Sequence, residues 1–573
     1  MSLVRGAARL GLRWAARKDD EAVRGLAQRL FGPSWRRFEA ATRDPVAVQT
    51  ARLNAILEQG RDTAFGQEHG FDRIRGWDDF RARVPVRDFE ASSPWLDRVV
   101  AGEGDVLFPG RPHFFGRTSG TTGKPKLIPV NAAFTEEMRR PRRVWARQLA
   151  LAFPGLVRGQ IFGMHSPTVE GRTEAGVPYG SVTVGLTTPP GRPERALEDG
   201  VLDAVPRAVF AVSDFELKYR LAARMAAQAP VALLSAINPS TVALLMKTLE
   251  AHAELIADEL EAGTFSDMTD LPEGVAKIVK PRLRAAPERA AALRAGISAR
   301  GRLEAKDLWP ELVGVSCWKG GSAPFFLGQL ERWLPGVPVM DQGMFATEGG
   351  FAFPLSPDAS GGVVAVLGHA LEFVPEAEAE AGDFSGARLA DTLEVGARYR
   401  LLVTGSHGLY RYDMNDVVEC TGHHHATAEI AFVHKGGHML SLTGEKVSEA
   451  QVVAAATAAA ARLGLSWSGF MATVSMDDPP RYAWWVEPDR PDPVAEEALS
   501  RALEDELRAQ NVEYAAKRDS LRLGPPTVVR LRPGAFAAER AERVAAGAPD
   551  AHLKPPHLGR DPELIRRLER YRA

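Results

Sequence analysis

The segment RTSGTTGKPKLIPVN, residues 117–131, combines groups that bind phosphate oxygens. Hydroxyl side chains alternate with glycines that let backbone N–H groups approach a ligand, at Thr118, Ser119, Gly120, Thr121, Thr122 and Gly123. Lys126 adds a positive charge, so the segment predicts a phosphate-binding loop. It is not a Walker A loop, because Pro125 follows Lys124 where a Ser or Thr would bind magnesium. Taken alone, the same residues would also suit a polar surface turn before the strand KLIPV.

Two further segments offer oxygen ligands. MFATEG, residues 344–349, follows the apolar run VPVMD and places Thr347 beside Glu348. Magnesium prefers oxygen ligands and must offset phosphate charge, which makes Glu348 a candidate metal ligand. YRYDMND, residues 410–416, contains Asp413 and Asp416, and a carboxylate suits two adjacent hydroxyl donors. In isolation Glu348 would equally be a solvated loop carboxylate.

Small residues and lysines complete the set of candidates. WKGGSAP, residues 318–324, contains Gly321, Ser322 and Ala323, whose backbone can approach a flat ring closely, although any tight turn has a similar composition. Lys446 in LTGEKVS offers a positive charge of the kind that stabilises developing negative charge. The alternative for Lys446 is a structural place in the turn ahead of a helix. Lys554 in HLKPPHL is a second candidate for an active-site lysine.

In this order, the segments resemble the motifs of the adenylate-forming enzymes, which activate carboxylic acids with ATP to give an acyl-adenylate and pyrophosphate. The resemblance implies that residues 118–123 and Lys126 bind the ATP phosphates, that Thr347 faces them and that Glu348 helps to hold Mg²⁺. It also implies that residues 321–323 border the adenine. Met344 stands where the superfamily has a tyrosine beside that base.

The resemblance extends to the ribose and to the reacting phosphate. It implies that Asp416 accepts hydrogen bonds from the ribose hydroxyls, with Asn415 in place of the usual glycine and Asp413 as a competing candidate. It implies that Lys446 approaches the α-phosphate during adenylation. Both assignments depend on the motif and not on spacing alone.

Within the superfamily, the chain resembles the GH3 acyl acid-amido synthetases. The strings that carry this resemblance are NPSTVALLMKTLEAHAELI, WPELVGVSCWKGGSAPFF and NVEYAAKRDSLRLGPPTVVRLRPGAF. Lys554 fits the family's Lys-x-Pro-Arg element, with His557 in place of the arginine. The family implies an AMP-forming ligase that joins a carboxylic acid to an amine such as an amino acid. The alternatives are an acid:CoA ligase with the same first half-reaction and a nucleotide-binding homologue without turnover.

The elements that must position these residues indicate an α/β chain of two unequal domains. We expect an N-terminal ATP- and acyl-acid-binding domain of the adenylate-forming type at residues 1–435, and a smaller, mobile α+β lid at residues 436–573. A helix begins after the cap Asn238 and ends at Gly263. YRLLVTGSHGLYRYDMNDVVECTG predicts two strands around a Ser-His-Gly turn, then a loop, then a third strand.

The lid has its own pattern of elements. We expect helices at residues 448–463 and 493–510, a hairpin of GFMATVSM and RYAWWVEP, and a strand at residues 527–531. This order predicts an antiparallel sheet with helices on one face.

Composition limits the partners. The 573 residues contain 71 Lys and Arg against 73 Asp and Glu, so no global charge favours nucleic acid or an anionic membrane. No apolar run predicts a membrane span, and no obligate protein partner is indicated. The two cysteines form no disulfide framework, which makes the cytoplasm the expected compartment. We interpret His423, His424 and His425 as a polar surface turn, since consecutive side chains point in different directions.

Overall fold

The computed structural model describes residues 17–118, 126–163, 169–182, 186, 202–320, 323–359, 361–436, 439–489, 494–536, 538, 539, 542, 557–559 and 561–573. Eight candidate residues lie outside this part of the chain: Ser119, Gly120, Thr121, Thr122, Gly123, Gly321, Ser322 and Lys554. The described residues form two compact units: residues 17–118 together with 127–434, and Lys126 together with the residues from Lys435 onward. The division of labour into a substrate-binding domain and a lid stays a prediction.

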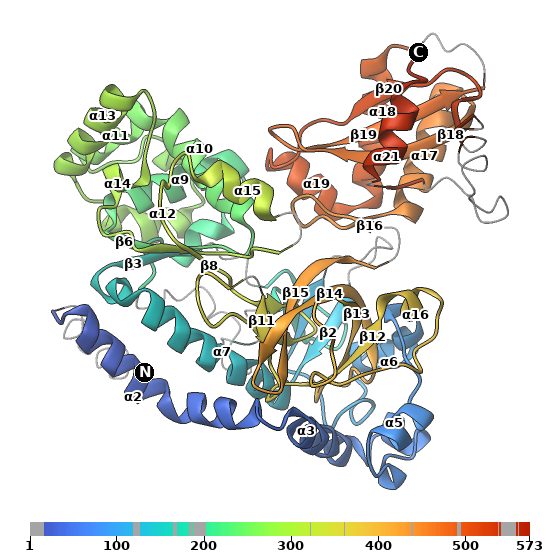
Figure 1. Cartoon of the computed structure of the whole chain (residues 1–573). Helices are drawn as coiled ribbons and strands as arrows, with labels where there is room; N and C mark the ends of the chain where they lie inside the picture. The colour runs from blue at the N-terminus through green and yellow to red at the C-terminus, as the bar shows by residue number, and fades with distance from the viewer. Residues whose placement is uncertain are drawn as a thin grey trace. The chain divides into compact units, whose positions relative to one another are not determined.

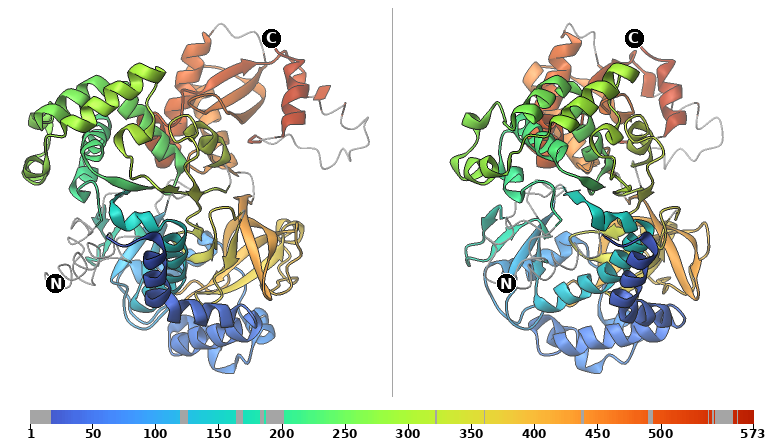
Figure 2. Two further views of the ribbon diagram at one scale, coloured as in Figure 1. Left: turned by 60° about the vertical axis from the view of Figure 1, so that its left-hand side comes forward. Right: turned by 90° about the vertical axis from the view of Figure 1, so that its left-hand side faces the viewer.

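Capped helices open the first unit. α2 (Asp20–Ala41) begins after Asp19, whose side chain accepts a hydrogen bond from the N–H of Ala22 at 2.8 Å. The next helices are α3 (Pro45–Gly60), α4 (Ala64–Glu68), α5 (Trp77–Arg83), α6 (Phe89–Val100) and α7 (Ala132–Ala152). α2 packs along α7, as Figures 1 and 2 show from three directions.

A parallel sheet lies at the centre of the α/β part. Its strands, in spatial order, are β3 (Gln160–Gly163), β6 (Val231–Ser235), β7 (Gly314–Ser316) and β8 (Val339–Met340). Helices cover one face: α9 (Phe215–Gln228), α10 (Pro239–Ala251), α11 (Ala253–Ala262), α12 (Glu273–Val279), α13 (Pro287–Arg300), α14 (Ala305–Leu308) and α15 (Ala323–Leu330). Leu233 faces the other way and packs with Leu149 of α7. Both faces are therefore buried, as a parallel sheet requires.

The helix expected between Asn238 and Gly263 is two helices. α10 and α11 meet at His252, whose backbone has φ −111° and ψ 23°. Both expected ends are confirmed, because Asn238 accepts a hydrogen bond from the N–H of Ser240 and Gly263 ends α11 with φ +70°. The apolar periodicity of the sequence continues through the bend, so it predicts one helix and not two.

A seven-stranded sheet forms the other half of the first unit. Its spatial order is β12 (Ala370–Pro375), β13 (Arg398–Thr404), β14 (Tyr412–His424), β15 (Thr427–Lys435), β11 (Gly362–Val364), β10 (Gly350–Phe353) and β9 (Met344–Phe345). α16 (Glu376–Glu380) follows β12. Its core is shared with side chains of α3, α5 and α6, among them Leu53, Phe80 and Leu96. The expected loop and separate third strand are wrong, because Tyr412–His424 is one strand.

A smaller sheet holds the two strands that flank the phosphate segment. Its order is β2 (Lys126–Val130), β1 (Phe114–Thr118), β5 (Pro178–Gly180) and β4 (Gly171–Arg172). β1 and β5 run parallel, with Gly116 opposite Gly180. The segment between β1 and β2 lies outside the described residues.

The second unit is an α+β fold. Its elements are β16 (Met439–Leu440), β17 (Val447–Ser448), α17 (Glu449–Leu463), β18 (Trp467–Ser475), β19 (Arg481–Pro488), α18 (Glu496–Gln510), α19 (Val512–Asp519), β20 (Thr527–Arg530) and α21 (Pro562–Glu569). The expected all-antiparallel sheet is wrong: β18 and β19 are antiparallel, but β20 lies parallel to β19. Because β19 and β20 are parallel, the chain must return from the end of β19 to the end of the sheet where β19 began. α18 and α19 form this crossover connection.

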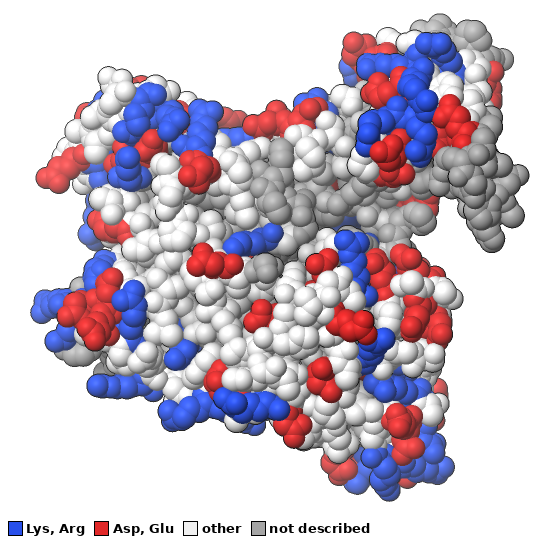
Figure 3. All heavy atoms as spheres, viewed as in Figure 1, with Lys and Arg blue, Asp and Glu red and all other residues white. Residues whose placement is uncertain are grey.

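The surface charges are mixed. On the face shown in Figure 3, Lys and Arg are interspersed with Asp and Glu in each unit, and uncharged side chains cover much of the first unit. Charges of both signs are thus mixed locally on this face, in keeping with the near-neutral net charge of the chain. No helix among the described residues has both the length and the apolar character needed to cross a membrane.

Candidate active site

The strand that leads into the phosphate segment contacts the Thr-Glu turn. A Cβ atom on Gly116 of β1 would stand 2.5 Å from the Cγ2 atom of Thr347 and 3.1 Å from Cβ of Val182. Real Cβ atoms do not approach so closely, so only glycine lets Thr347 lie against β1. The structure therefore brings Thr347 to the strand that ends at Thr118.

The Thr347-Glu348 turn connects β9 to β10 and is tightly closed. The Ala346 N–H donates to the Gly349 carbonyl at 2.8 Å. A Cβ on Gly349 would stand 2.8 Å from Nε2 of His369 and 2.7 Å from a ring carbon of Phe351, so both rings lie directly against the turn. Glu348 and Thr347 are half-buried. The turn thus depends on a buried histidine for its position.

His369 belongs to a buried polar cluster that includes Glu137 of α7. Nδ1 of His369 lies 3.0 Å from Oε2 of Glu137, and Arg52 donates to Oε1 at 2.5 Å. Ser406 donates to the same carboxylate from its N–H and its hydroxyl. Burial disfavours the charge, but His369, Arg52 and Ser406 outweigh it and lower the pKa of Glu137 to about 2. The carboxylate is therefore ionised at neutral pH.

Asp416 lies at an irregularity of β14. Arg400 of β13 pairs with Val417, whereas Leu402 pairs with Asp413, so Met414, Asn415 and Asp416 form extra length on the β14 side. Asn415 has φ +61°, a conformation that Asn adopts more readily than most residues. Bulges of this kind redirect side chains and are common beside active sites. Asp416 is buried here.

The neighbouring Asp413 has a structural role. Its Oδ1 accepts a hydrogen bond from the N–H of Asn415 at 2.7 Å, and its Oδ2 lies 3.2 Å from the Arg400 guanidinium. Arg400 also donates to the Asn415 side chain at 2.5 Å. Asp413 therefore stabilises the bulge that carries Asp416.

Tyr412 links the metal and ribose candidates. Burial raises the pKa of Tyr412 well above its ordinary value, and the nearby carboxylates of Glu348, Asp88, Asp413 and Asp416 raise it further. Glu348 and Asp416 thus act on the same phenol, although one lies in the β9–β10 turn and the other in β14. The candidate ligands here are carboxylates and the Thr347 hydroxyl. All of them are oxygen donors, the type of ligand that Mg²⁺ prefers.

The adenine candidates lie beyond the carboxyl ends of the parallel strands. Ala323 begins α15 just after β7, and the half-buried Met344 follows β8. Asp341 links the segment after β7 to the segment after β8. Its side chain accepts hydrogen bonds from the N–H groups of Lys319 at 3.1 Å and Gly343 at 2.7 Å. Burial raises the pKa of Asp341, and these hydrogen bonds partly offset the effect. Carboxyl ends of parallel strands are where open α/β sheets bind ligands.

Lys446 belongs to the second unit and lies in a loop organised by Glu445. The buried Glu445 carboxylate accepts hydrogen bonds from the N–H groups of Leu442 at 2.6 Å and Thr443 at 2.7 Å, and from the Tyr482 hydroxyl at 2.7 Å. Asn511 donates to the carbonyl of Glu445 at 3.1 Å. Lys446 itself has φ +50°. The helix expected at residues 448–463 is α17, which begins at Glu449 after the cap Ser448 and has a capping box with Gln451.

Within the first unit, Gly116 lets Thr347 lie against the strand that ends at Thr118, and Glu348 and Asp416 both act on Tyr412. Ala323 and Met344 follow the carboxyl ends of β7 and β8. Lys126 begins β2, next to β1. Sequence reasoning missed four supporting residues: Gly116, Glu137, His369 and Tyr412. The Ser-His-Gly turn was noticed, but nothing local connected it with Glu137, which lies 269 residues before Ser406.

Comparison with known proteins finds one family along most of the chain. Residues 34–339 match the GH3 family N-terminal domain, residues 363–435 the GH3 family central domain and residues 450–563 the GH3 family C-terminal domain. A probable indole-3-acetic acid-amido synthetase GH3.2 from Oryza sativa subsp. japonica is 25% identical, over 91% of this chain and 89% of its own length. Jasmonoyl--L-amino acid synthetase JAR6 from Nicotiana attenuata is 25% identical, over 74% of this chain and 75% of its own.

A solved structure supports the fold. AtGH3.15 acyl acid amido synthetase in complex with 2,4-DB superposes with a TM-score of 0.64 at 21% identity, over 97% of this chain and 96% of that one. The expected α/β architecture with a smaller C-terminal α+β domain is confirmed at the level of fold. With domain matches that run from residue 34 to residue 563, the chain belongs to the GH3 family.

Proposed function

We propose that this chain uses ATP to adenylate a carboxylic acid and then transfers the acyl group to the amine of an amino acid. The observation that carries the proposal is the packing of Thr347 against Gly116, which joins the Thr-Glu turn to the strand of the phosphate segment. Membership of the GH3 family and the names of its relatives as amido synthetases support amide formation.

In the first step, a carboxylate oxygen attacks the α-phosphorus of ATP and the bond to pyrophosphate breaks. Thr118, Lys126 and Thr347 bind phosphate oxygens, together with residues 119–123, and Asp416 accepts hydrogen bonds from the ribose hydroxyls. Residues 321–323 and Met344 border the adenine. Glu348 and its neighbouring oxygen donors hold Mg²⁺, which would offset the charge of the triphosphate.

In the second step, the amine nitrogen attacks the acyl carbon, AMP leaves and the amine loses a proton. Because the acyl-adenylate is a reactive anhydride, the site must exclude water until the amine has bound. We assign that role to a mobile second unit by its likeness to family lids. The same likeness assigns Lys446, and after it Lys554, to the negative charge at the reacting phosphate.

We propose that the site acts with its acid, its amine, ATP and Mg²⁺, and without a protein partner. Both cysteines, Cys317 and Cys420, are buried and free, which suits a reducing compartment and leads us to propose the cytoplasm.

The deciding experiment is carboxylate-dependent exchange of labelled pyrophosphate into ATP with a broad library of acids. Exchange with one class of acid identifies the donor and supports adenylation. The active acid is then supplied with ATP and either a panel of amino acids or CoA, and the product mass is measured. An amide product supports the proposal; a thioester would establish the acid:CoA ligase instead, and ATP binding without exchange would establish the non-catalytic homologue.

A further inference from the structure

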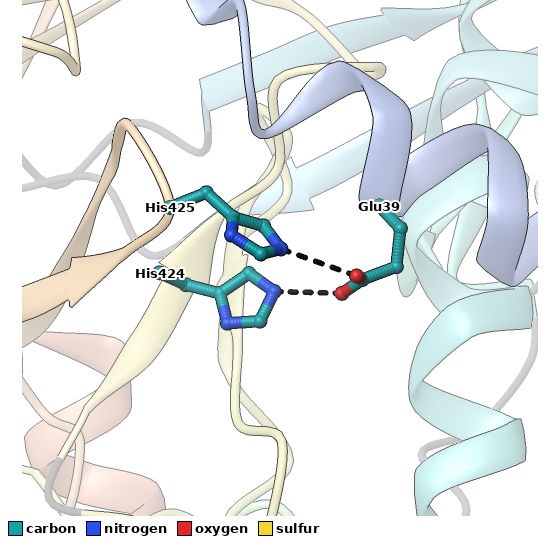
Figure 4. Close-up of side chains that lie close together, drawn as sticks. All are labelled: Glu39, His424 and His425. Atoms are coloured by element: carbon teal, nitrogen blue, oxygen red, sulfur yellow. Dashed lines mark hydrogen bonds and ion pairs between the residues drawn. The ribbon is translucent and has the colours of Figure 1, made fainter.

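The turn between β14 and β15 gathers imidazoles that the sequence interpretation had separated. His424 ends β14, and His425 adopts φ +54° in the turn that follows. This left-handed conformation reverses the usual alternation of side chains. Both rings therefore point to the same carboxylate, Glu39 of α2 (Figure 4). The expectation of divergent side chains is wrong for these two histidines, while His423 is exposed and is not part of the group.

The three side chains have the geometry of a metal-binding triad. Nε2 of His424 lies 2.7 Å from Oε1 of Glu39, and Nε2 of His425 lies 3.2 Å from Oε2. All three candidate ligand atoms lie within 4.8 Å of one another. Ligands about 2 Å from a tetrahedral zinc ion are a little over 3 Å apart, so modest side-chain rotation would suffice.

Neighbouring side chains orient the triad and leave it accessible. The ring of Phe38 is stacked with that of His424, with centroids 6.4 Å apart and an interplanar angle of 9°. The side chains of Glu39, His424 and His425 are 25%, 22% and 29% exposed. A metal ion can therefore enter from solvent, and a water molecule can complete its coordination.

The donor types select the class of metal. Two neutral imidazole nitrogens and one carboxylate suit Zn²⁺, Ni²⁺, Co²⁺ and Cu²⁺, whereas Mg²⁺ prefers oxygen donors. Burial disfavours the charge of Glu39, but its hydrogen bonds to both histidines more than compensate and lower the pKa of Glu39. The charge of Glu39 also acts on Arg147, whose guanidinium lies 4.4 Å from the Trp35 ring centroid.

We propose that Glu39, His424 and His425 form a binding site for a divalent transition metal of the zinc class. Bound there, the ion joins α2 to the β14–β15 turn, two segments 385 residues apart in sequence. An ion that binds only the folded chain raises the free energy of unfolding by mass action. The site is therefore a metal-dependent link within the first unit, and Glu348 takes no part in it.

The test uses the full chain, freed of metal with a chelator and dialysed at pH 7.5. Zn²⁺ titration by calorimetry is followed for the wild type and for Glu39→Gln, His424→Asn and His425→Asn. His423→Asn is the matched control, because it removes the neighbouring exposed imidazole. Asn at position 425 tolerates the left-handed backbone, so that variant keeps the turn. Circular dichroism of each variant establishes that it is folded.

We expect one zinc site in the wild type and in His423→Asn, and at least a tenfold loss of affinity in each of the other three. Zinc should raise the thermal unfolding midpoint of the first two by a few degrees and leave the others unmoved. Co²⁺ should give visible absorption typical of tetrahedral coordination, and millimolar Mg²⁺ should not displace zinc. No uptake by the wild type, or equal uptake by all variants, overturns the proposal. The zinc titration does not measure adenylation, and pyrophosphate exchange does not measure zinc binding. The two experiments therefore test this proposal and the proposed function separately.

Discussion

Two carboxylates three residues apart in β14 have different surroundings. Asp413 is engaged with Arg400 and the Asn415 N–H, whereas Asp416 lies at the end of the bulge that these contacts stabilise. We predict that Asp416→Asn raises KM for ATP about 10- to 100-fold, since a hydrogen bond to a charged group contributes about 1.5–3 kcal/mol. The thermal unfolding midpoint should change little.

Asp413→Asn is the matched comparison for that prediction. It removes the ion pair with Arg400 but keeps the size of the side chain, so it should lower the unfolding midpoint by about 2–4 °C. Steady-state kinetics and a thermal scan on both variants separate the two roles. An unchanged KM in Asp416→Asn would remove this residue from the ribose site.

A test of Lys446 requires a substitution that tolerates its left-handed backbone conformation. With φ +50°, alanine would add strain to the loss of the amine, whereas asparagine accepts this conformation. We predict that Lys446→Asn lowers the rate of pyrophosphate exchange about 100-fold or more, the effect of removing one group that stabilises transition-state charge. ATP binding by calorimetry should be nearly unchanged. Lys277→Asn, at a site 73% exposed on α12, provides the control and should exchange normally.

At the scale of elements, the contact between β1 and the Thr-Glu turn gives the sharpest prediction. In Gly116→Ala the new methyl group collides with Cγ2 of Thr347, so the turn that carries Glu348 must move. We predict a drop of at least tenfold in exchange, because displacements of about 1 Å can cost 100-fold in rate.

The clash with Thr347 can be relieved, while the tight contact of the new Cβ with Val182 at 3.1 Å remains. Thr347→Ser keeps the hydroxyl and removes Cγ2, so the double variant Gly116→Ala, Thr347→Ser should recover much of the lost exchange. Gly274→Ala is the control, since a Cβ there meets no atom within 4 Å. If the double variant is as impaired as Gly116→Ala alone, the contact between the two elements does not govern the site.

Elements with strong local rules could be predicted from sequence. Asn238, Pro239, Gly263 and Ser448 mark helix ends through capping chemistry, and each lies where expected. The bend at His252 and the continuity of β14 could not be predicted, because both depend on tertiary contacts. The bulged residues of β14 lie in a strand that pairs with β13. Their polar sequence is typical of a loop, so it predicts a loop there.

The same contrast applies to the candidate site. Motif residues such as Thr347, Glu348 and Asp416 could be identified because their types and order carry chemistry. Gly116, Glu137 and His369 support them from distant parts of the sequence, and no short pattern marks them. His424 and His425 were separated by a rule for regular strands, and the positive φ of His425 breaks that rule.

At the scale of the whole molecule, the first unit contains a buried cluster that makes its stability depend on pH. His407 lies fully buried against Phe134, with ring centroids 4.1 Å apart, and close to His369 and Glu137. Neither ring nitrogen of His407 has a hydrogen-bond partner among the described residues. Burial and the charge of His369 lower the pKa of His407 from 6.5 to about 3, although Glu137 acts in the opposite direction.

Acidification should therefore weaken the first unit before Glu137 contributes. Between pH 6.5 and 4.5 the unfolded chain protonates His407 while the folded chain does not, so protons bind the unfolded state preferentially. The free energy of unfolding should fall by up to about 1.4 kcal/mol per pH unit from this residue. Below pH 4.5, protonation of Glu137 in the unfolded chain acts in the same direction, since its folded pKa is about 2. Urea unfolding of the wild type and of His407→Gln at pH 7, 6 and 5 measures the slope. The variant starts less stable but should lose less stability on acidification; equal slopes would show that His407 is already protonated, or solvated, in the folded chain.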